Sequence, residues 1–192
     1  DIFCGGANVI VNVEAKELIG VDINNKVISL FVYFKNTKED VILNEISNVI
    51  RHYGLSESNL NSYESYGCNS SDGLGVFNKI KYAALRNDYN SENYIFEKNI
   101  MFFVLVVFGF NNQIRFNSQN KFNIPVGKRD FNEKIKANLE KFLIAIKTKN
   151  ISFINKSYKE IEINEGFVYA DPPYLISNAT YNESGGWCKN KE

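Results

Sequence analysis

The sequence predicts an α/β protein in which a parallel sheet is interrupted by a helical and hairpin insertion. Two short apolar runs, residues 18–21 and 151–154, have the length of buried strands. Strand and helix signals alternate near both ends of the chain, which is typical of a parallel sheet. The length of 192 residues suits one domain or slightly more.

The elements at the start of the chain are predicted in order from local signals. A glycine turn at Gly5-Gly6 leads into a helix predicted over residues 8–15. The apolar strand at residues 18–21 follows and ends at Asp22. A second helix is predicted because apolar residues then recur at helical spacing, namely Val27, Ile28, Leu30, Phe31 and Phe34.

The middle of the chain predicts helices and one hairpin. Residues 76–110 are expected to be helical, with the apolar run at 100–108 as the buried end. That run is too short to cross a bilayer, which takes about 20 residues. Residues 116–126 predict two extended pieces around a polar turn at Ser118-Gln119-Asn120, and residues 132–147 predict an amphipathic helix.

After the strand at residues 151–154, a second buried strand is predicted over residues 166–170. It delivers Asp171-Pro172-Pro173-Tyr174 at its carboxyl end, where open α/β sheets bind ligands. The two prolines stiffen this loop and leave carbonyl oxygens free beside a carboxylate. Such acceptors, with an aromatic ring next to them, suit the exocyclic amino group of a planar base.

Composition excludes several classes of protein. The 22 basic and 22 acidic residues balance, and a chain that is 44% hydrophobic is neither collagenous nor disordered. Overall neutrality argues weakly against nucleic-acid binding. Charge is nevertheless uneven, since residues 115–149 hold nine basic residues against three acidic ones, and residues 1–50 hold four against seven. A local basic stripe can neutralise phosphates in a neutral chain.

The tetrapeptide at residues 171–174, together with four further passages, resembles the Dam-type or D12 class of N6-adenine DNA methyltransferases. The passages occur in the family's order: residues 1–6, Asp22, the hairpin at residues 115–127, and Ser157-Tyr158. The resemblance implies a Rossmann-like S-adenosylmethionine-dependent fold, with an incomplete sheet, and a DNA-recognition insertion. It divides the chain into a catalytic domain, residues 1–50 and 148–192, and a target-recognition insertion, residues 51–147.

The resemblance also implies residue roles. Asp22 would hold the ribose hydroxyls of S-adenosylmethionine, and the glycine turn would let the backbone approach the ligand closely. On the residues alone, Asp22 could equally cap the helix that follows it. The full set expected at the cofactor comprises Asp1, Phe3, Gly5, Gly6, Asp22, Ile23, Ser157, Tyr158 and Asp171.

The residues expected at double-stranded DNA are Arg115, Asn117, Asn123, Pro125 and Lys128. Arginine suits guanine and asparagine suits adenine in the major groove. In the catalytic loop, Asp171 and the Pro172 carbonyl would accept the hydrogens of a flipped-out adenine amino group, and Tyr174 would stack on the base. Pro173 completes the loop.

Other expectations are negative or open. Three widely spaced cysteines indicate reduced thiols, and no cluster predicts a metal site. We expect a cytoplasmic, nucleoid-associated and monomeric protein of bacterial or phage-like type, without a membrane partner. Both ends of the chain look truncated. The alternatives are an inactive fragment with residual DNA affinity, or a methyltransferase acting on RNA or a protein amide. GATC is the default target.

Overall fold

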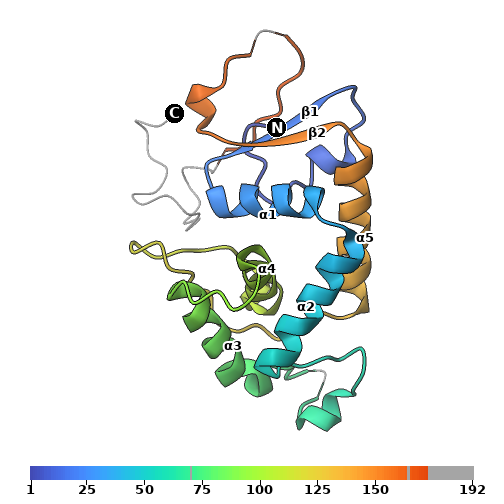
Figure 1. Cartoon of the computed structure of the whole chain (residues 1–192), viewed down its shortest axis with the longest axis vertical. Coiled ribbons are helices and arrows are strands. Elements are labelled where there is room, and N and C mark those ends of the chain that lie inside the picture. Colours follow the sequence, from blue (N-terminus) through green and yellow to red (C-terminus); the bar gives the residue numbers. More distant parts are fainter. Residues whose placement is uncertain (70, 164, 173–192) are drawn as a thin grey trace. The chain divides into compact units, whose positions relative to one another are not determined.

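The computed structural model describes residues 1–69, 71–163 and 165–172. Within this part of the chain, one compact unit contains residues 1–38 and 139–172, and a second contains residues 39–138. Figure 1 shows the elements of both units. The functional labels that the sequence suggests for the two halves remain predictions.

The first unit contains two parallel strands, β1 (Leu18–Asp22) and β2 (Ile151–Asn155). Their register pairs Leu18 with Ile151 and Asp22 with Asn155, so the two strands end together. Helix α1 (Asn25–Asn36) lies along one face of the pair (Figure 1), and the ring of Phe31 lies 5.0 Å from that of Phe153. The two strands and this helix confirm the sequence predictions.

Helix α1 begins where Asn24 caps it, since the Asn24 side chain accepts hydrogen bonds from the amides of Lys26 and Val27. The residues that α1 buries are those whose spacing predicted it: Val27, Ile28, Leu30, Phe31 and Phe34. The end of helix α5 (Glu133–Thr148) joins the same core, where Phe142 lies 5.3 Å from Phe31. These aromatic rings pack together with the buried aliphatic residues of the strands and helices, such as Val21, Leu143 and Ile151, in the core of the unit.

Hydrogen bonds continue the strand pair on the other edge of β1. The terminal amino group of Asp1 donates to the Ile19 carbonyl at 2.9 Å, and the amide of Val21 donates to the Asp1 carbonyl at 2.8 Å. Residues 1–4 therefore lie beside β1, and on their other side the Ile2 amide donates to the Tyr169 carbonyl at 3.1 Å. The lateral order is therefore β2, β1, residues 1–4 and the segment around Tyr169.

Two predictions for this unit are wrong. The helix expected at residues 8–15 is a single 3-10 turn, η1 (Ile10–Asn12), because Ile10 alone among its three residues is buried and no apolar stripe holds a longer helix. The strand expected to be buried at residues 166–170 is exposed, with Phe167 92% accessible. Within the described residues, the segment at 166–170 pairs with the rest of the sheet through one backbone hydrogen bond, from Ile2 to Tyr169, and does not form a regular strand.

The second unit packs three helices, α2 (Glu39–Tyr53), α3 (Gly75–Asn90) and α4 (Lys98–Phe108), against one another. Helix α4 is the apolar run of the sequence and is buried almost all round. Helix α2 was not predicted, although Ile42, Ile46, Val49 and Ile50 form a buried stripe along it. The short 3-10 turns of the chain, besides η1, are η2 (Tyr63–Tyr66), η3 (Phe110–Asn112) and η4 (Tyr158–Glu160).

The helix predicted over residues 76–110 is wrong as a continuous element, because residues 91–97 separate α3 from α4. Glu92 adopts a positive φ of 58°, which ends a right-handed helix. Glu97 then begins α4 by accepting a hydrogen bond from the Asn99 amide. The break lets α4 turn its apolar side chains toward both α2 and α3.

The hairpin predicted over residues 116–126 is confirmed. Phe116 and Phe122 pair in antiparallel fashion, and the amide of Asn117 donates to the Lys121 carbonyl at 2.9 Å. The turn between them closes through a 2.8 Å bond from the Asn120 amide to the Asn117 carbonyl. No helix among the described residues is long and apolar enough to span a bilayer.

Candidate active site

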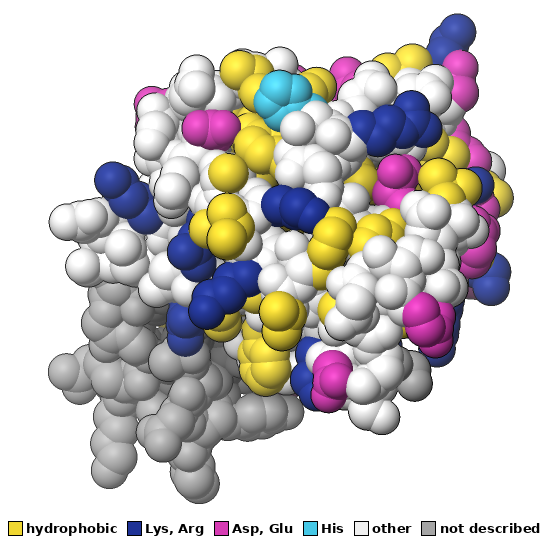
Figure 2. Space-filling model, turned by 90° about the horizontal axis from the view of Figure 1, so that it is seen from below, with side chains coloured by type: hydrophobic (Ala, Val, Ile, Leu, Met, Phe, Trp, Pro, Cys, Tyr) yellow, Lys and Arg dark blue, Asp and Glu magenta, His cyan; other side chains and the backbone are white. Residues whose placement is uncertain are grey.

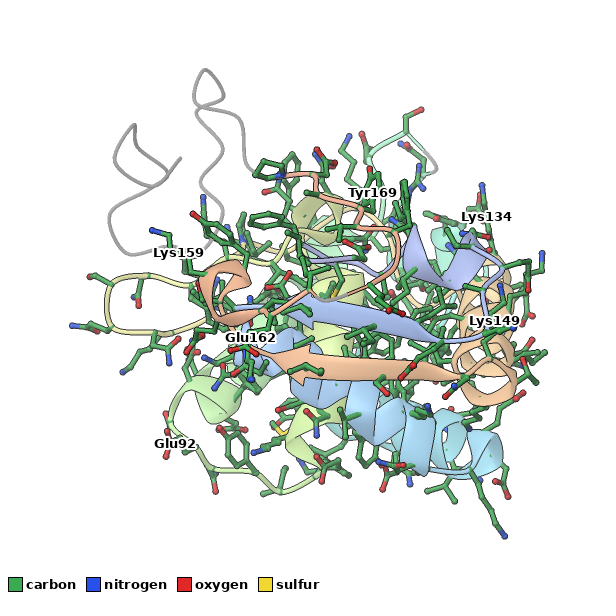
Figure 3. All side chains as sticks on the ribbon, turned by 90° about the horizontal axis from the view of Figure 1, so that it is seen from above. Glu92, Lys134, Lys149, Lys159, Glu162 and Tyr169 are labelled. Carbon is green, nitrogen blue, oxygen red and sulfur yellow. The ribbon has the colours of Figure 1, made fainter. Side chains whose placement is uncertain are left out.

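Four of the residues expected at the cofactor, Phe3, Gly5, Asp22 and Tyr158, lie where the parallel strands end. Asp22 is the last residue of β1, and η4 follows shortly after the last residue of β2, Asn155. Figure 3 shows the two strands side by side, with Lys149 near their amino ends and Lys159 beyond their carboxyl ends. The carboxyl edge is the ligand-binding edge of open α/β sheets.

The Asp22 carboxylate is held by two backbone amides. Its Oδ2 accepts from the Gly5 amide at 2.8 Å and its Oδ1 accepts from the Asn24 amide at 2.8 Å. Each carboxylate oxygen has further acceptor capacity beyond one such bond. The carboxylate is therefore fixed in place against the glycine turn and can still accept hydrogen bonds from a ligand's hydroxyl groups.

The glycine turn leaves space beside this carboxylate. Gly5 has a positive φ of 44°, and a Cβ built there would meet no atom within 4 Å. A Cβ on Gly6 would lie 3.6 Å from the Asn8 side chain. Gly5 is thus needed for its backbone conformation, and the space above the turn is open to a ligand.

Aromatic side chains lie near the same edge. The rings of Phe3 and Tyr158 are 5.2 Å apart and inclined at 36°. Ser157 begins η4 in a capping box, in which its amide donates to Glu160 Oε2 at 2.8 Å and its side chain accepts from the Lys159 amide. Ile23 is 56% exposed. Ser157 therefore fixes the turn that carries Tyr158.

A nucleoside ligand fits these residues. An anchored carboxylate suits a ribose diol, the open glycine backbone allows close approach, and the Phe3–Tyr158 pair offers apolar ring surface. These are the elements that S-adenosylmethionine would require. In the described part of the chain, no group of three His, Cys, Asp or Glu side chains is placed to hold a metal.

The catalytic loop is described only in part. Asp171 is exposed and Pro172 is half-buried, and both follow the segment that pairs with Ile2 through Tyr169. Pro173 and Tyr174 lie outside the described residues. The roles expected of all four residues therefore remain predictions.

Cys4 is a buried thiol next to the glycine turn, 5% exposed. Burial, reinforced by the nearby Asp22 carboxylate, raises the pKa of Cys4 to about 12. At pH 8 only about one Cys4 in ten thousand would carry a thiolate. We expect iodoacetamide to modify Cys4 at least about 100-fold more slowly than the half-buried Cys68, as followed by peptide mapping. Equal rates at the two cysteines would contradict the burial of Cys4.

In the second unit, the hairpin residues expected at DNA bond to one another. Arg115 Nε donates to Asn123 Oδ1 at 2.8 Å, and another guanidinium nitrogen donates to the Asn123 carbonyl at 3.2 Å. Asn117 Oδ1 accepts from the amides of Gln119 and Lys121, both at 3.0 Å. Arg115 and Asn123 therefore lie side by side on one strand pair, and Asn117 stabilises the turn.

Pro125 and Lys128 lie beyond the hairpin turn and are both exposed. The Pro125 carbonyl accepts from the Phe110 amide at 2.9 Å, and Lys128 Nζ donates to the Ser71 carbonyl at 3.2 Å. Figure 2 shows one face of the molecule, on which Lys and Arg side chains lie among apolar and uncharged ones. Contacts of the five hairpin-region residues (Arg115, Asn117, Asn123, Pro125 and Lys128) with DNA bases or phosphates remain predictions.

Sequence reasoning missed a buried polar network in this unit. Asp130 is fully buried and accepts hydrogen bonds from Ser58 Oγ at 2.6 Å, from the Ser58 amide at 2.7 Å and from Ser56 Oγ at 3.0 Å. Ser56 in turn exchanges two bonds of 2.9 Å with the Asn78 side chain. Because Asp130 follows Lys128-Arg129, its local context indicated a solvent-exposed charge.

A sequence model of the D12 class N6 adenine-specific DNA methyltransferases matches residues 1–192, and the chain belongs to this family. The match confirms the family that the sequence motifs suggested.

Individual relatives include methylases of two kinds. The chain is 30% identical over 189 residues to the type II methyltransferase M.FokI of Planomicrobium okeanokoites, covering 95% of this chain and 26% of that protein. It is 31% identical to the modification methylase StsI of Streptococcus sanguinis, covering 95% and 25%. It is 25% identical to the DNA adenine methylase of Escherichia coli K12, covering 94% and 57%. The chain thus spans about a quarter of the length of the first two relatives.

Proposed function

We propose that the protein is a site-specific DNA adenine N6-methyltransferase, which transfers the methyl group of S-adenosylmethionine to an adenine flipped out of duplex DNA. The observation that carries the proposal is the Asp22 carboxylate held against the Gly5 amide at the strand ends, in a chain of the D12 family. The names of the relatives, methylases that include a DNA adenine methylase, agree with it.

The proposed fold of the first unit is Rossmann-like. Support comes from the lateral order of β2, β1, residues 1–4 and the segment around Tyr169. Residues 1–4, the first segment in the chain, have β1 and then β2 on one side and the last segment, around Tyr169, on the other. In such a sheet the acid at the end of β1 is placed for a ribose. The second unit is proposed to be the target-recognition part.

In the proposed site, Asp22 would accept the ribose hydroxyls, and Phe3 and Tyr158 would border the rest of the nucleoside. S-adenosylmethionine, when bound, supplies an electrophilic methyl group. The chain's own task is to hold the adenine amino group in line with that methyl group and to exclude water.

Asp171 and the Pro172 carbonyl would accept hydrogen bonds from the two N–H groups of the adenine amino group, and one of these protons would be released to solvent after the N–CH3 bond has formed and the S–CH3 bond has broken. These acceptors direct the nitrogen lone pair and stabilise the positive charge that develops on that nitrogen. The target base must leave the stack to reach them. Tyr174, outside the described residues, is proposed to stack on the extruded base.

The test is a methylation assay with S-adenosylmethionine labelled in the methyl group. We expect label in duplex DNA as N6-methyladenine at one recurrent sequence, with GATC as the first candidate. Ribosomal RNA and a mixed protein fraction serve as competing acceptors. Label in RNA or protein in place of DNA, or DNA binding without transfer, would overturn the proposal and favour the corresponding alternative.

A further inference from the structure

Helix α3 carries a row of four side chains that bond to segments distant in the sequence. Asn78, Tyr82, Arg86 and Asn90 recur every four residues, so they lie along one face of the helix. The face is polar in part but deeply packed, because Asn78 and Tyr82 are buried and Arg86 and Asn90 are half-buried. Such a row is unusual for a helix face that packs against other elements.

The side-chain amide of Asn90 forms two hydrogen bonds with the backbone of one hairpin residue, Phe122, in the way that a neighbouring strand would. Its Nδ2 donates to the Phe122 carbonyl at 2.9 Å, and its Oδ1 accepts from the Phe122 amide at 2.8 Å. One side-chain amide thus satisfies both polar groups of a residue that is 1% exposed.

The next two side chains of the row, Arg86 and Tyr82, bind the carbonyl of Ile124, two residues after Phe122. Arg86 Nη1 donates to the Ile124 carbonyl at 3.0 Å, and the Tyr82 hydroxyl donates to the same carbonyl at 3.1 Å. Tyr82 also reaches the Leu105 carbonyl of α4 at 3.2 Å. The second hairpin strand is therefore fixed to α3 at alternate residues, Phe122 and Ile124.

This alternation determines which side chains the hairpin presents. Successive side chains of a strand point to opposite faces. With Phe122 and Ile124 buried, the intervening Asn123 and the flanking Lys121 and Pro125 are left half-buried or exposed on the other face. On this face, Asn123 Oδ1 accepts the 2.8 Å hydrogen bond from Arg115 Nε.

The far end of the row fixes the segment after the hairpin. Asn78 holds Ser56, and Ser56 bonds to the buried carboxylate of Asp130, next to Lys128-Arg129. The Leu74 amide, at the start of α3, donates to the Lys128 carbonyl at 2.9 Å. Both the hairpin and the basic segment are thus tied to one helix.

We infer that α3 acts as the template that positions the DNA-reading hairpin, with Asn90 and Arg86 as positioning residues for recognition of the target sequence. The inference deepens the proposed function and rests on it. Neither residue needs to touch DNA, because each acts by fixing the backbone that carries Arg115 and Asn123.

The test compares Asn90→Ala with Asn87→Ala, an exposed asparagine on the same helix, in the intact protein. In Asn90→Ala we expect faster hydrogen exchange at the Phe122 amide and a roughly tenfold higher KM for target DNA. Discrimination against a duplex with one altered base pair should also fall about tenfold, which corresponds to about 1.4 kcal/mol. The affinity for S-adenosylmethionine and kcat at saturating DNA should stay unchanged, and Asn87→Ala should match the wild type throughout.

If Asn90→Ala fails to fold, Arg86→Met and Arg86→Lys provide the test. These variants are milder because the Tyr82 hydroxyl still donates to the Ile124 carbonyl when Arg86 is replaced. Arg86→Met should lose discrimination severalfold, and Arg86→Lys, which keeps a donor, should restore it. Wild-type methylation with unchanged discrimination in Asn90→Ala or Arg86→Met overturns this inference alone. A wild-type protein that neither binds nor methylates DNA overturns the proposed function and this inference with it.

Discussion

Replacing Asp171 with alanine is expected to slow methyl transfer by at least about a hundredfold while leaving DNA binding largely intact. The carboxylate is proposed to accept a hydrogen of the adenine amino group and to stabilise the positive charge that develops there. Loss of one such preorganised group typically lowers kcat by about 10²–10³-fold. Single-turnover methylation with labelled S-adenosylmethionine measures the loss, and a gel-shift titration with the same duplex measures DNA affinity.

Two further variants make this result specific. Asp171→Asn keeps an acceptor oxygen but loses the charge, so its rate should lie between those of the wild type and Asp171→Ala. Glu165→Ala removes an exposed acid from the same segment and should retain the wild-type rate. Full activity of Asp171→Ala would exclude the proposed mechanism, and equal losses in Asp171→Ala and Glu165→Ala would point to a general disturbance of the segment.

Replacing Asp22 with alanine should weaken the binding of S-adenosylmethionine by about 10- to 100-fold. The estimate follows from hydrogen bonds to a charged acceptor, at about 1.5–3 kcal/mol each, and from tenfold in affinity per 1.4 kcal/mol. The variant also leaves the amides of Gly5 and Asn24 without the acceptor that now fixes the glycine turn. Isothermal titration calorimetry with S-adenosylmethionine measures the change.

The control for Asp22 is Glu17→Ala, an exposed acid that immediately precedes β1. It should bind S-adenosylmethionine with wild-type affinity. DNA binding by Asp22→Ala should also be unchanged, since the residues predicted to contact the duplex around the target base, Arg115 and Asn123 among them, lie in the other unit. Unaltered cofactor affinity in Asp22→Ala would remove Asp22 from the proposed ribose site.

Local patterns predicted the parts of the fold that depend on local signals. The strand at residues 18–21 and helix α1 follow from an apolar run and from helical spacing, and Asp22 stands at the strand end where the motif placed it. The hairpin was readable because a polar turn separates two apolar pieces. Helix α2 was missed although its buried residues, Ile42, Ile46, Val49 and Ile50, recur at helical spacing and its other face is exposed, which is the pattern of an amphipathic helix.

The break between α3 and α4 had a signal in the sequence that the prediction overlooked, because residues 87–93 are rich in Asn, Asp and Ser, which favour turns. In the structure, a positive φ at Glu92 and the cap at Glu97 mark the break. The exposed segment at residues 166–170 shows the reverse case. Its apolar sequence indicated a buried strand, but burial requires neighbouring layers, which the described residues do not supply.

The sequence by itself determined the family, the acid at the end of β1 and the position of the hairpin, because each is marked by short passages whose own residues are adjacent in the chain. Only the tertiary structure decided how the hairpin is held. Asn90 lies 32 residues from Phe122, and Asp130 lies 74 residues from Ser56. Side chains at such separations leave no periodic signal, and their partners are set when buried polar groups must find hydrogen bonds as the helices pack.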